Sequence, residues 1–400
     1  MILQNKNKVM KSIGLVSVHN PNYGSMLQTY ALHTYLNSIP NVANEIILYT
    51  KKKDWKQFVR LFNIPLVIMK GRVVYRDLYC RLFHGDISRE LAVRQAKFNE
   101  FKDKYFTFSR NHVGWKDLKN ANQEYDVFMI GSDQVWNPIN TGTDFFNLLF
   151  TDDNKFRISY ASSFGVSEIP KSQIRKTIHF LNRIQCLSTR EKAGVHIIKS
   201  LTGRDATLVC DPTLLVDKTL WDKLKGEERF IKEKYIFCYF LGNNPPHRAF
   251  ANRFKEKTGY KLVALQHLDE LVLSDIPFAD IKPFNVGPAE FVNLIANAEY
   301  VLTDSFHGTI FSLLFKKQFF TFSRFESADK ASTNSRIVSL LDIVGVKGRY
   351  IKASESVDDC LRRKIDFDYA HQRIKEIQED SRNFLSNSLR LACINDTNKG

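Results

Sequence analysis

Short apolar segments of strand length alternate with longer segments of helical spacing along most of the chain. This alternation is typical of parallel βαβ units. It gives two series of predicted strands, one at residues 13–18, 45–49, 126–130, 157–161, 184–188 and 207–210, and a second at residues 235–240, 261–265, 300–303 and 319–322. The pattern therefore predicts an α/β fold with two Rossmann-like, doubly wound domains.

The polar stretch 216–234 separates the two series and predicts the junction between the domains. We expect an N-terminal Rossmann-like domain over residues 12–216 and a C-terminal one over residues 234–345. Two open parallel sheets that face each other place a ligand cleft between the carboxyl ends of their strands. A C-terminal helix is expected over residues 366–395, packing back on the N-terminal domain, because apolar positions recur there at helical spacing: Ile374, Ile377, Phe384 and Leu389.

A basic insertion occupies residues 51–110 of the predicted N-terminal domain, and its part from 86 to 105 has helical spacing. It contains fifteen Lys or Arg against six Asp or Glu and so supplies more than half of the formal net charge of +15. Such a surface attracts the phosphates of nucleic acids, lipid headgroups or small substrates. Because no known nucleic-acid-binding motif accompanies it, we expect no nucleic-acid partner. A membrane-surface element, a lid and a solvated helical hairpin are the three interpretations that stay open.

The composition, with 44% apolar and 25% charged residues, is typical of a globular protein. No apolar run approaches the ~18 residues of a membrane-spanning helix. The segment 12–18 is too short for a signal-peptide core. We expect a cytoplasmic protein, with peripheral contact at the inner face of the membrane as the open alternative. The six cysteines have no C-x-x-C spacing, so we expect reduced thiols and neither a disulfide framework nor a metal site.

The segment 19–25, which contains Asn22 and Gly24, follows a predicted strand and precedes a predicted helix at 26–37. Free backbone N–H groups and the positive end of a helix dipole at such a place can bind an anion or a polar ligand. The segment lacks the G-x-G-x-x-G spacing of a dinucleotide site. An ordinary turn between a strand and a helix is an equally good interpretation.

The segment 131–137 also follows an apolar strand directly, and it contains Ser132, Asp133 and Trp136. Polar groups at the end of a buried strand are costly unless they are solvated, capped or bound to a ligand. Capping of a following helix by Ser132 or Asp133 is the structural alternative.

Arg190 stands where a predicted strand meets a helix that starts near Glu191. A guanidinium at this place can bind a carboxylate or a phosphate through two N–H groups, and the helix N-terminus adds to the same field. A salt bridge between Arg190 and a neighbouring carboxylate is the structural alternative.

The segment 303–309 joins the predicted strand 300–303 to an apolar helix at 310–315, and it brings four residues of interest to the mouth of the second sheet: Asp304, Ser305, His307 and Gly308. Histidine is the side chain best suited to proton transfer near neutral pH. Its place in a polar cluster at a strand exit favours a catalytic over a structural role. Lys317 and Arg336 are further cations that can reach a ligand in the expected cleft.

Taken in order, these segments resemble the polysaccharide pyruvyl transferase family. The resemblance extends from about residue 13 to about residue 341 and is carried by Asn22-Tyr23-Gly24, Leu27-Gln28, Tyr30-Ala31-Leu32, the segment 131–137, Ser188-Thr189-Arg190-Glu191, Asp211-Pro212-Thr213 and Asp304-Ser305-Phe306-His307-Gly308. It implies two Rossmann-like domains of the GT-B type. It also implies transfer of a pyruvyl group from phosphoenolpyruvate to a sugar of a cell-surface or extracellular polysaccharide, or of its precursor, as a cyclic ketal.

The resemblance places Arg190 and His307 around the phosphate and carboxylate of the donor. Some members carry an arginine two residues before the histidine, where this chain has Ser305, so the missing donor contacts are expected from Lys317 or Arg336. Gln318 stands where a proline often follows the lysine.

We assign His307 the acid/base role and Asp304 the control of its tautomer or charge. Donor-binding residues are expected to be Arg190, Ser305, Gly308, Lys317 and Arg336. The acceptor side or cleft is expected to involve Asn22, Gly24, Ser132, Asp133 and Trp136. No cofactor or metal is expected besides the donor substrate, and the acceptor sugar can be free, nucleotide-linked or lipid-linked.

Two rival functions remain on the same scaffold, since a fold does not decide a function. One is a GT-B glycosyltransferase that uses a nucleotide-sugar donor. The other is a non-catalytic sugar-binding relative.

Overall fold

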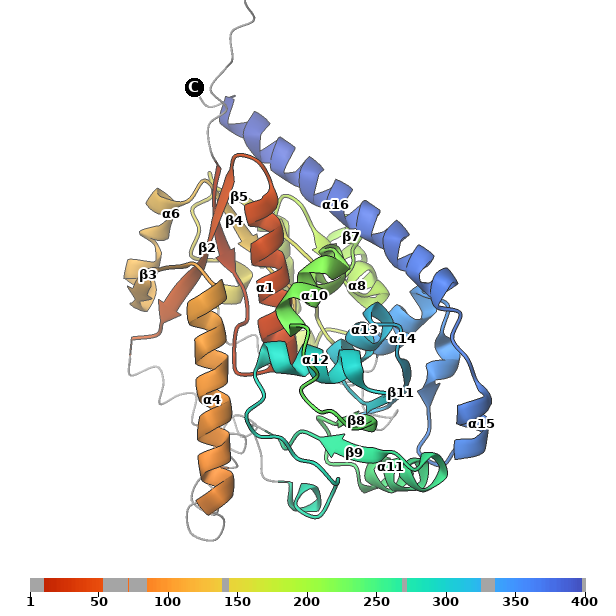
Figure 1. Ribbon diagram of the computed structural model, residues 1–400. Coiled ribbons are helices and arrows are strands. Elements are labelled where there is room, and N and C mark those ends of the chain that lie inside the picture. Colours follow the sequence, from red (N-terminus) through yellow and green to blue (C-terminus); the bar gives the residue numbers. More distant parts are fainter. Residues whose placement is uncertain are drawn as a thin grey trace, which may run out of the picture.

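The computed structural model describes residues 11–52, 71, 85–138, 144–267, 272–324 and 335–397. These residues form two lobes, each built on a five-stranded, entirely parallel sheet (Figure 1). The prediction of an α/β fold with two Rossmann-like domains is thereby confirmed.

The sheet of the first lobe has the strand order β3-β2-β1-β4-β5. Its strands are β1 (Lys11–Val16), β2 (Val42–Thr50), β3 (Phe108–Val113), β4 (Val127–Ile130) and β5 (Phe156–Ser159). A short pair, β6 (Ser188–Thr189) and β7 (Thr207–Leu208), continues the sheet beyond β5. The helices of this lobe are α1 (Tyr23–Ser38), α4 (Gly85–Tyr105), α5 (Gly114–Leu118), α6 (Ala121–Glu124), α7 (Ile174–Arg183), α8 (Lys192–Thr202) and α9 (Pro212–Leu215), with 3-10 turns at Asp144–Asn147 and Lys171–Gln173.

The sheet of the second lobe has the order β12-β11-β10-β8-β9. Its strands are β8 (Tyr235–Tyr239), β9 (Lys261–Ala264), β10 (Tyr300–Thr303), β11 (Gln318–Phe322) and β12 (Tyr350–Ile351). The helices are α10 (Lys218–Lys225) in the connection between the lobes, then α11 (Pro245–Thr258), α12 (Pro288–Asn297), α13 (Phe306–Leu314), α14 (Ser335–Ile343) and α15 (Val357–Arg362), with 3-10 turns at Leu273–Asp275 and Lys347–Arg349.

Apolar side chains are buried on both faces of the two sheets, as parallel sheets require. In β4, Val127 and Met129 face one apolar cluster while Phe128 and Ile130 face another. The first of these clusters also contains Phe237 of the second sheet, so that one core extends through both lobes.

Two strands are absent from the sequence prediction. β3 is an edge strand in which Ser109 and His112 are buried while Arg110 and Asn111 are exposed, and this polar composition looks like a loop. β12 has only two residues. β3 begins within the last residues of the predicted insertion, and α4 is the crossover helix between β2 and β3. Residues 53–70 and 72–84 of the insertion lie outside the described residues.

Helix α4 lies against both lobes with its buried side. Phe98 packs on the ring of Tyr23 in the first lobe, with 4.9 Å between ring centroids. Arg94, on the same side of α4, donates hydrogen bonds to the backbone carbonyls of the second lobe at Gln266 (2.7 Å), Pro283 (3.1 Å) and Phe284 (3.3 Å). The apolar side of α4 is therefore buried against the two lobes.

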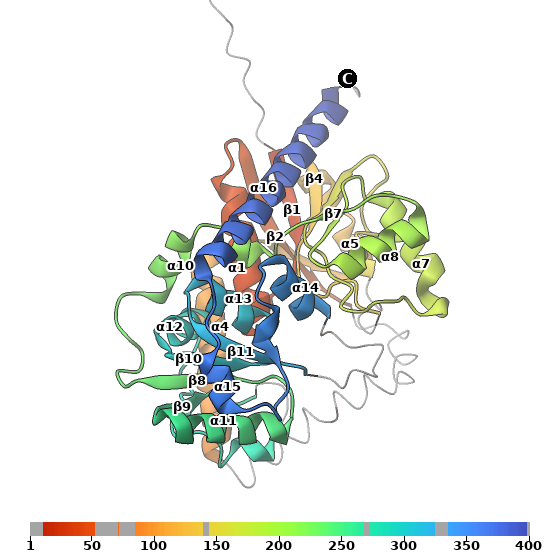
Figure 2. The same cartoon turned by 90° about the vertical axis from the view of Figure 1, so that its right-hand side faces the viewer.

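A long helix, α16 (Phe367–Thr397), runs from the second lobe across to the first (Figure 2). Near its start, His371 contacts the carbonyl of Leu313 in α13 at 2.8 Å. Further along, Gln378 donates to the carbonyl of Leu214 at 2.9 Å, and the Ser381 hydroxyl accepts from the backbone N–H of Cys210 at 2.8 Å. The helix thus connects the end of α13 to the α9 region of the first lobe.

Within the part of the chain that the structure describes, no helix has both the length and the apolar composition that a membrane crossing requires. The five cysteines in this part are free thiols: Cys186, Cys210, Cys238, Cys360 and Cys393.

Candidate functional site

Loops at the carboxyl ends of strands from both lobes meet where the lobes touch. The turn after β1 opens α1, with the Asn22 side chain accepting from the backbone N–H of Ser25 at 3.2 Å. The turn after β10 opens α13, with Ser305 accepting from the N–H of Gly308 at 3.3 Å. Both segments therefore end in side-chain N-caps, which satisfy N–H groups that a helix start leaves unpaired.

Arg190 lies at the centre of this junction and is buried between two carboxylates. Its guanidinium donates to Asp211 Oδ2 at 2.5 Å and to Asp133 Oδ1 at 3.1 Å, with Ser132 Oγ at 3.3 Å. Burial would lower the pKa of Arg190, but Asp211 and Asp133 outweigh it and hold the pKa above its usual value. The structure therefore shows the salt bridge between Arg190 and neighbouring carboxylates that was the structural alternative. It also places Ser132 and Asp133 in contact with Arg190.

Asp133 adopts a left-handed backbone conformation, with φ of 76°, that residues other than glycine rarely adopt. Its carboxylate is fixed by Arg190 and by the Ser25 hydroxyl, which donates at 2.7 Å. Burial alone would raise the pKa of Asp133, but Arg190 and His307 lower it by more. The pKa therefore lies below its usual value, and the carboxyl stays charged. Backbone strain of this kind is found at functional sites, where surrounding contacts hold it.

Asp211 joins Arg190 to the second lobe. One carboxylate oxygen caps α9 by accepting from the N–H of Thr213 at 3.0 Å, and the other accepts from Arg190 and from Ser132 at 3.1 Å. The same oxygen is 3.7 Å from Nε2 of His307. Burial alone would raise the pKa of Asp211, but His307 and Arg190 hold it well below the usual range.

His307 lies in the first turn of α13, in the second lobe, and its imidazole contacts the first lobe. A Cβ added to Gly24 of α1 would lie 2.0 Å from Nδ1 of His307, so the ring rests directly on the glycine backbone. Its other nitrogen faces Asp211. With 7% of its surface exposed, His307 is enclosed at the junction between the lobes.

Asp304, which was expected to orient His307, has other hydrogen-bond partners in the structure. Its two oxygens accept from the backbone N–H groups of Leu241 (2.7 Å) and Gly242 (2.9 Å) after β8. Asp304 therefore fixes the loop between β8 and α11, and Asp211 takes the place beside the imidazole.

Arg336, in the first turn of α14, also reaches the junction. Its guanidinium lies 5.5 Å from the centre of the Phe306 ring, and that of Arg190 lies 4.7 Å from the same ring. Burial, and then the positive charge of Arg190, lower the pKa of Arg336 to about 9. Glu191 is buried nearby, and burial raises its pKa although Arg190 and Arg336 oppose this shift.

Two residues expected at the site lie elsewhere. Trp136 is in the core of the first lobe against Phe164 and Phe180, with ring centroids 5.2 and 5.4 Å away. Lys317 follows the carboxyl end of α13, at the opposite end of the helix from His307. Gly308 remains in the first turn of α13, where a Cβ would lie 2.6 Å from Thr303 Oγ1, so it allows close packing on β10.

Three residues of the site carry no role in the sequence prediction: Ser25, Glu191 and Asp211. In the sequence, Asp-Pro before a short helix is explained by capping alone. The signal that could have found Asp211 is its position directly after the predicted strand 207–210, next in the chain after the strand that precedes Arg190.

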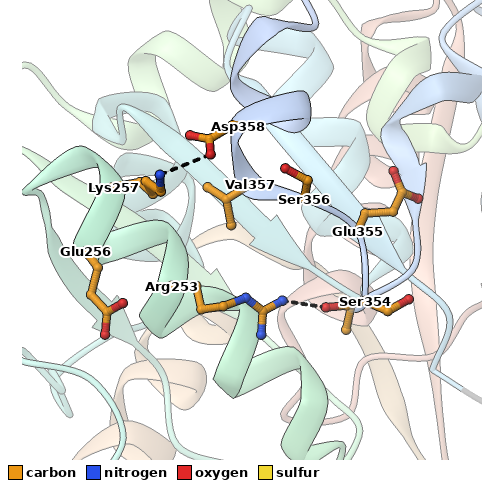
Figure 3. Close-up of a pocket in the computed structure, with 9 residues that line it drawn as sticks. Arg253, Glu256, Lys257, Ser354, Glu355, Ser356, Val357 and Asp358 are labelled. Carbon is orange, nitrogen blue, oxygen red and sulfur yellow. Dashed lines mark hydrogen bonds and ion pairs between the residues drawn. The ribbon is translucent and has the colours of Figure 1, made fainter.

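Among the described residues no group of three or more His, Cys, Asp or Glu is arranged to hold a metal ion. A surface pocket in the second lobe lies between α11 and the segment before α15 (Figure 3). It is spanned by an ion pair between Lys257 and Asp358 (3.0 Å) and by a hydrogen bond from Arg253 to the carbonyl of Ala353 (2.7 Å). This pocket contains none of the residues of the junction.

Solved structures with a similar arrangement have little sequence in common with this chain. The N-terminal domain of Candida albicans trehalose-6-phosphate phosphatase is 11% identical, with 97% of this chain and 98% of that chain covered and a TM-score of 0.50. UDP-GlcNAc 2-epimerase from Methanocaldococcus jannaschii, in complex with UDP-GlcNAc and UDP, is 10% identical, with coverages of 92% and 99% and a TM-score of 0.49. At this identity the likeness to the trehalose-6-phosphate phosphatase domain concerns the fold alone, which has two Rossmann-like domains here.

A search of curated proteins found no match. The sequence model of the family described as polysaccharide pyruvyl transferase matches residues 22–325, a range that includes Gly24, Arg190, Asp211 and His307. The match covers most of both sheets and agrees with the resemblance seen in the sequence motifs. The chain therefore belongs to the polysaccharide pyruvyl transferase family.

Proposed function

We propose that the protein transfers the pyruvyl group of phosphoenolpyruvate to two hydroxyl groups of one sugar, in the synthesis of a cell-surface or extracellular polysaccharide. The family supports a transferase acting on such a polysaccharide. The observation that carries the proposal is the enclosed imidazole of His307, held between Gly24 and Asp211 where the two lobes meet.

The reaction needs proton transfer at two stages. A proton is added at C3 of phosphoenolpyruvate while a sugar hydroxyl loses its proton and bonds to C2. The C2–O bond to phosphate then breaks, and a second hydroxyl of the same sugar bonds to C2 and closes the ketal. One hydroxyl proton ends on C3 and the other leaves with the phosphate, so the reaction balances without an oxidant or reductant.

His307 is the proposed acid and base. Imidazole exchanges protons near neutral pH, and a position at the start of a helix places it where an anionic donor is favoured. The Asp211 carboxylate, 3.7 Å from Nε2, stabilises the cationic ring that acts as the acid. Exclusion of water from the junction strengthens this interaction.

Arg190 was expected to bind the donor, but its charge is already offset by Asp133 and Asp211. We assign it the positioning of these carboxylates: it keeps Asp211 ionised and directed at His307. Ser132 donates a further hydrogen bond to Asp211, and Ser25 donates one to Asp133. In this arrangement Arg190 acts through Asp211 on the histidine.

The test is incubation of the purified protein with phosphoenolpyruvate and a panel of free, nucleotide-linked and lipid-linked sugars, with phosphate and product mass both measured. We expect phosphate release that depends on one acceptor, with a pyruvyl ketal on that acceptor. His307→Gln should abolish both, while His196→Gln, which changes an exposed histidine of α8, should leave both unchanged.

Release of a nucleotide from a nucleotide-sugar, without use of phosphoenolpyruvate, would instead establish a glycosyltransferase. Near-normal phosphate release by His307→Gln would remove the histidine from the reaction. Sugar binding without turnover of either donor would identify a non-catalytic relative.

A further inference from the structure

Helix α14 presents buried polar atoms that have no hydrogen-bond partner among the residues the structure describes. They are Oγ of Ser335, Nε of Arg336 and Oγ of Ser339. Arg336 is only 6% exposed and Ser339 only 8% exposed. Buried polar atoms are nearly always paired in folded proteins, because an unpaired one costs the full loss of its hydration. Three such atoms within two turns of one helix indicate that something else supplies their partners.

These three side chains lie on one side of α14. Ser335 and Ser339 are one helical turn apart, and Arg336 is adjacent to Ser335. The Arg336 guanidinium lies 5.5 Å from the ring centre of Phe306, which is the first residue of α13 and precedes His307. The start of α14 therefore faces the start of α13, beside the candidate acid/base.

The charge balance at the junction distinguishes Arg336 from Arg190. Arg190 forms ion pairs with Asp133 and Asp211, whereas Arg336 forms none with a described carboxylate. Burial and then Arg190 lower the pKa of Arg336, and Asp133 and Glu191 oppose this shift only in part. An anion bound here would form an ion pair with a cation that has none with a described carboxylate.

The chemistry of the donors fits a tetrahedral oxyanion. Two hydroxyls and one guanidinium lie on one side of the first turns of this nine-residue helix, at the end where the helix dipole is positive. A phosphate offers three terminal oxygens to such a set, while a planar carboxylate is best bound by one guanidinium fork.

We propose that Arg336, Ser335 and Ser339 bind the phosphate group of phosphoenolpyruvate at the start of α14, next to His307. The inference rests on the proposed function for the identity of the phosphate, and it assigns the donor's phosphate to α14 rather than to Arg190. Ser339 contributes here as a binding residue that no motif of the sequence indicated.

The experiment is calorimetric titration of the full chain with inorganic phosphate and with phosphoenolpyruvate. In Arg336→Gln we expect both affinities to fall at least about tenfold, as for the loss of a charge-assisted contact. Ser339→Ala removes one hydroxyl without a large change in volume and should weaken both ligands by about threefold or more. Arg253→Gln, at an exposed arginine of the same lobe, is the matched control and should bind as the unchanged protein does.

Kinetics separate binding from a merely structural effect. Arg336→Gln and Ser339→Ala should raise the KM for phosphoenolpyruvate and leave the KM for the sugar acceptor unchanged, and Arg336→Lys should restore part of the affinity. If Arg336→Gln fails to fold by circular dichroism, Ser335→Ala and Ser339→Ala decide the question. Unchanged phosphate affinity in the folded variants, or no binding of either anion by the unchanged protein, would overturn the inference.

Failure of the inference and failure of the proposed function give different results. Phosphate binding that depends on Arg336, in a protein that transfers no pyruvyl group, would leave the α14 site standing and reject the reaction. Pyruvyl transfer with an unchanged KM for phosphoenolpyruvate in Arg336→Gln would keep the reaction and reject the site.

Discussion

Gly24 is the residue on which the position of the His307 imidazole depends. The ring occupies the space where any other residue would place its Cβ, only 2.0 Å from Nδ1. Because Gly24 belongs to the first lobe and His307 to the second, this contact sets the histidine relative to Asp211 as well. A single methyl group at position 24 therefore tests whether the imidazole must lie where it does.

We predict that Gly24→Ala displaces the imidazole and lowers turnover at least about tenfold, with a loss of stability of about 1–3 kcal/mol, as is usual for overpacking. Turnover with phosphoenolpyruvate and thermal unfolding are the two measurements. Gly348→Ala is the matched control, since a Cβ there has no atom within 4 Å and should change neither quantity. Normal turnover in Gly24→Ala would show that the reaction tolerates a displaced ring.

At the residue scale the sequence placed Arg190, Asp133 and His307 together, because each follows a strand and the carboxyl ends of parallel strands meet. It paired Asp304 with His307 because they are three residues apart, whereas the hydrogen bonds of Asp304 go to the loop after β8. Asp211 comes from the other lobe, and only the packing of the lobes brings it to the imidazole.

Among the elements, α4 has the most specific role in joining the lobes. It belongs to the crossover between β2 and β3, yet Arg94 donates all its described hydrogen bonds to carbonyls of the second lobe. A guanidinium that satisfies three backbone carbonyls in a buried place cannot be removed without leaving them unpaired. The helix therefore connects the two lobes through polar contacts as well as through Phe98.

We predict that Arg94→Ala lowers the free energy of unfolding by about 2 kcal/mol or more, because buried carbonyls lose a charged donor. Urea unfolding followed by circular dichroism measures this change. Arg89→Ala, on the same helix, removes an exposed ion pair with Asp86 and should change stability by no more than about 0.5 kcal/mol. Equal stabilities of the two variants would show that α4 contributes little to the junction.

The strands of the centre of each sheet were predictable, since apolar runs such as Val127–Ile130 are long enough to stand out. The edges were not, because β3 needs burial on one side only and β12 pairs through two residues. Helix α4 was predicted from its apolar spacing, but its contact with the second lobe was not. The sequence does not distinguish a buried arginine such as Arg94 from a solvated one.

For the whole molecule, the buried contact between Asp211 of the first lobe and His307 of the second makes the stability of the fold depend on acid pH. The pKa of Asp211 is held below its ordinary value of 3.8, mainly by His307 of the opposite lobe once burial is outweighed. The folded protein then binds fewer protons than the unfolded chain near and below that pH, so acid favours unfolding. The stability that this carboxylate contributes is present above the ordinary carboxyl pKa and is lost as the pH falls below it.

We predict that the free energy of unfolding falls less steeply between about pH 5 and pH 3 in Asp211→Asn than in the unchanged protein. The amide takes up no proton, so this part of the acid response disappears, although the variant is less stable at pH 7. Urea unfolding at a series of pH values gives both slopes. Asp153→Asn, which changes an exposed carboxylate, should keep the original slope. Parallel slopes in all three proteins would contradict the role given to Asp211.

The indole of Trp221 gives the molecule a built-in optical reporter. Its ring lies 4.9 Å from that of Phe311 in α13 and 5.9 Å from that of Tyr30 in α1, so it contacts both lobes at once. Trp115 and Trp136 belong to the apolar cluster on the far side of the first sheet and would not sense a change at the junction. In a Trp55→Phe variant, which removes the tryptophan outside the described residues, a shift in tryptophan emission upon mixing with a substrate would therefore follow the lobes in real time, without any attached dye.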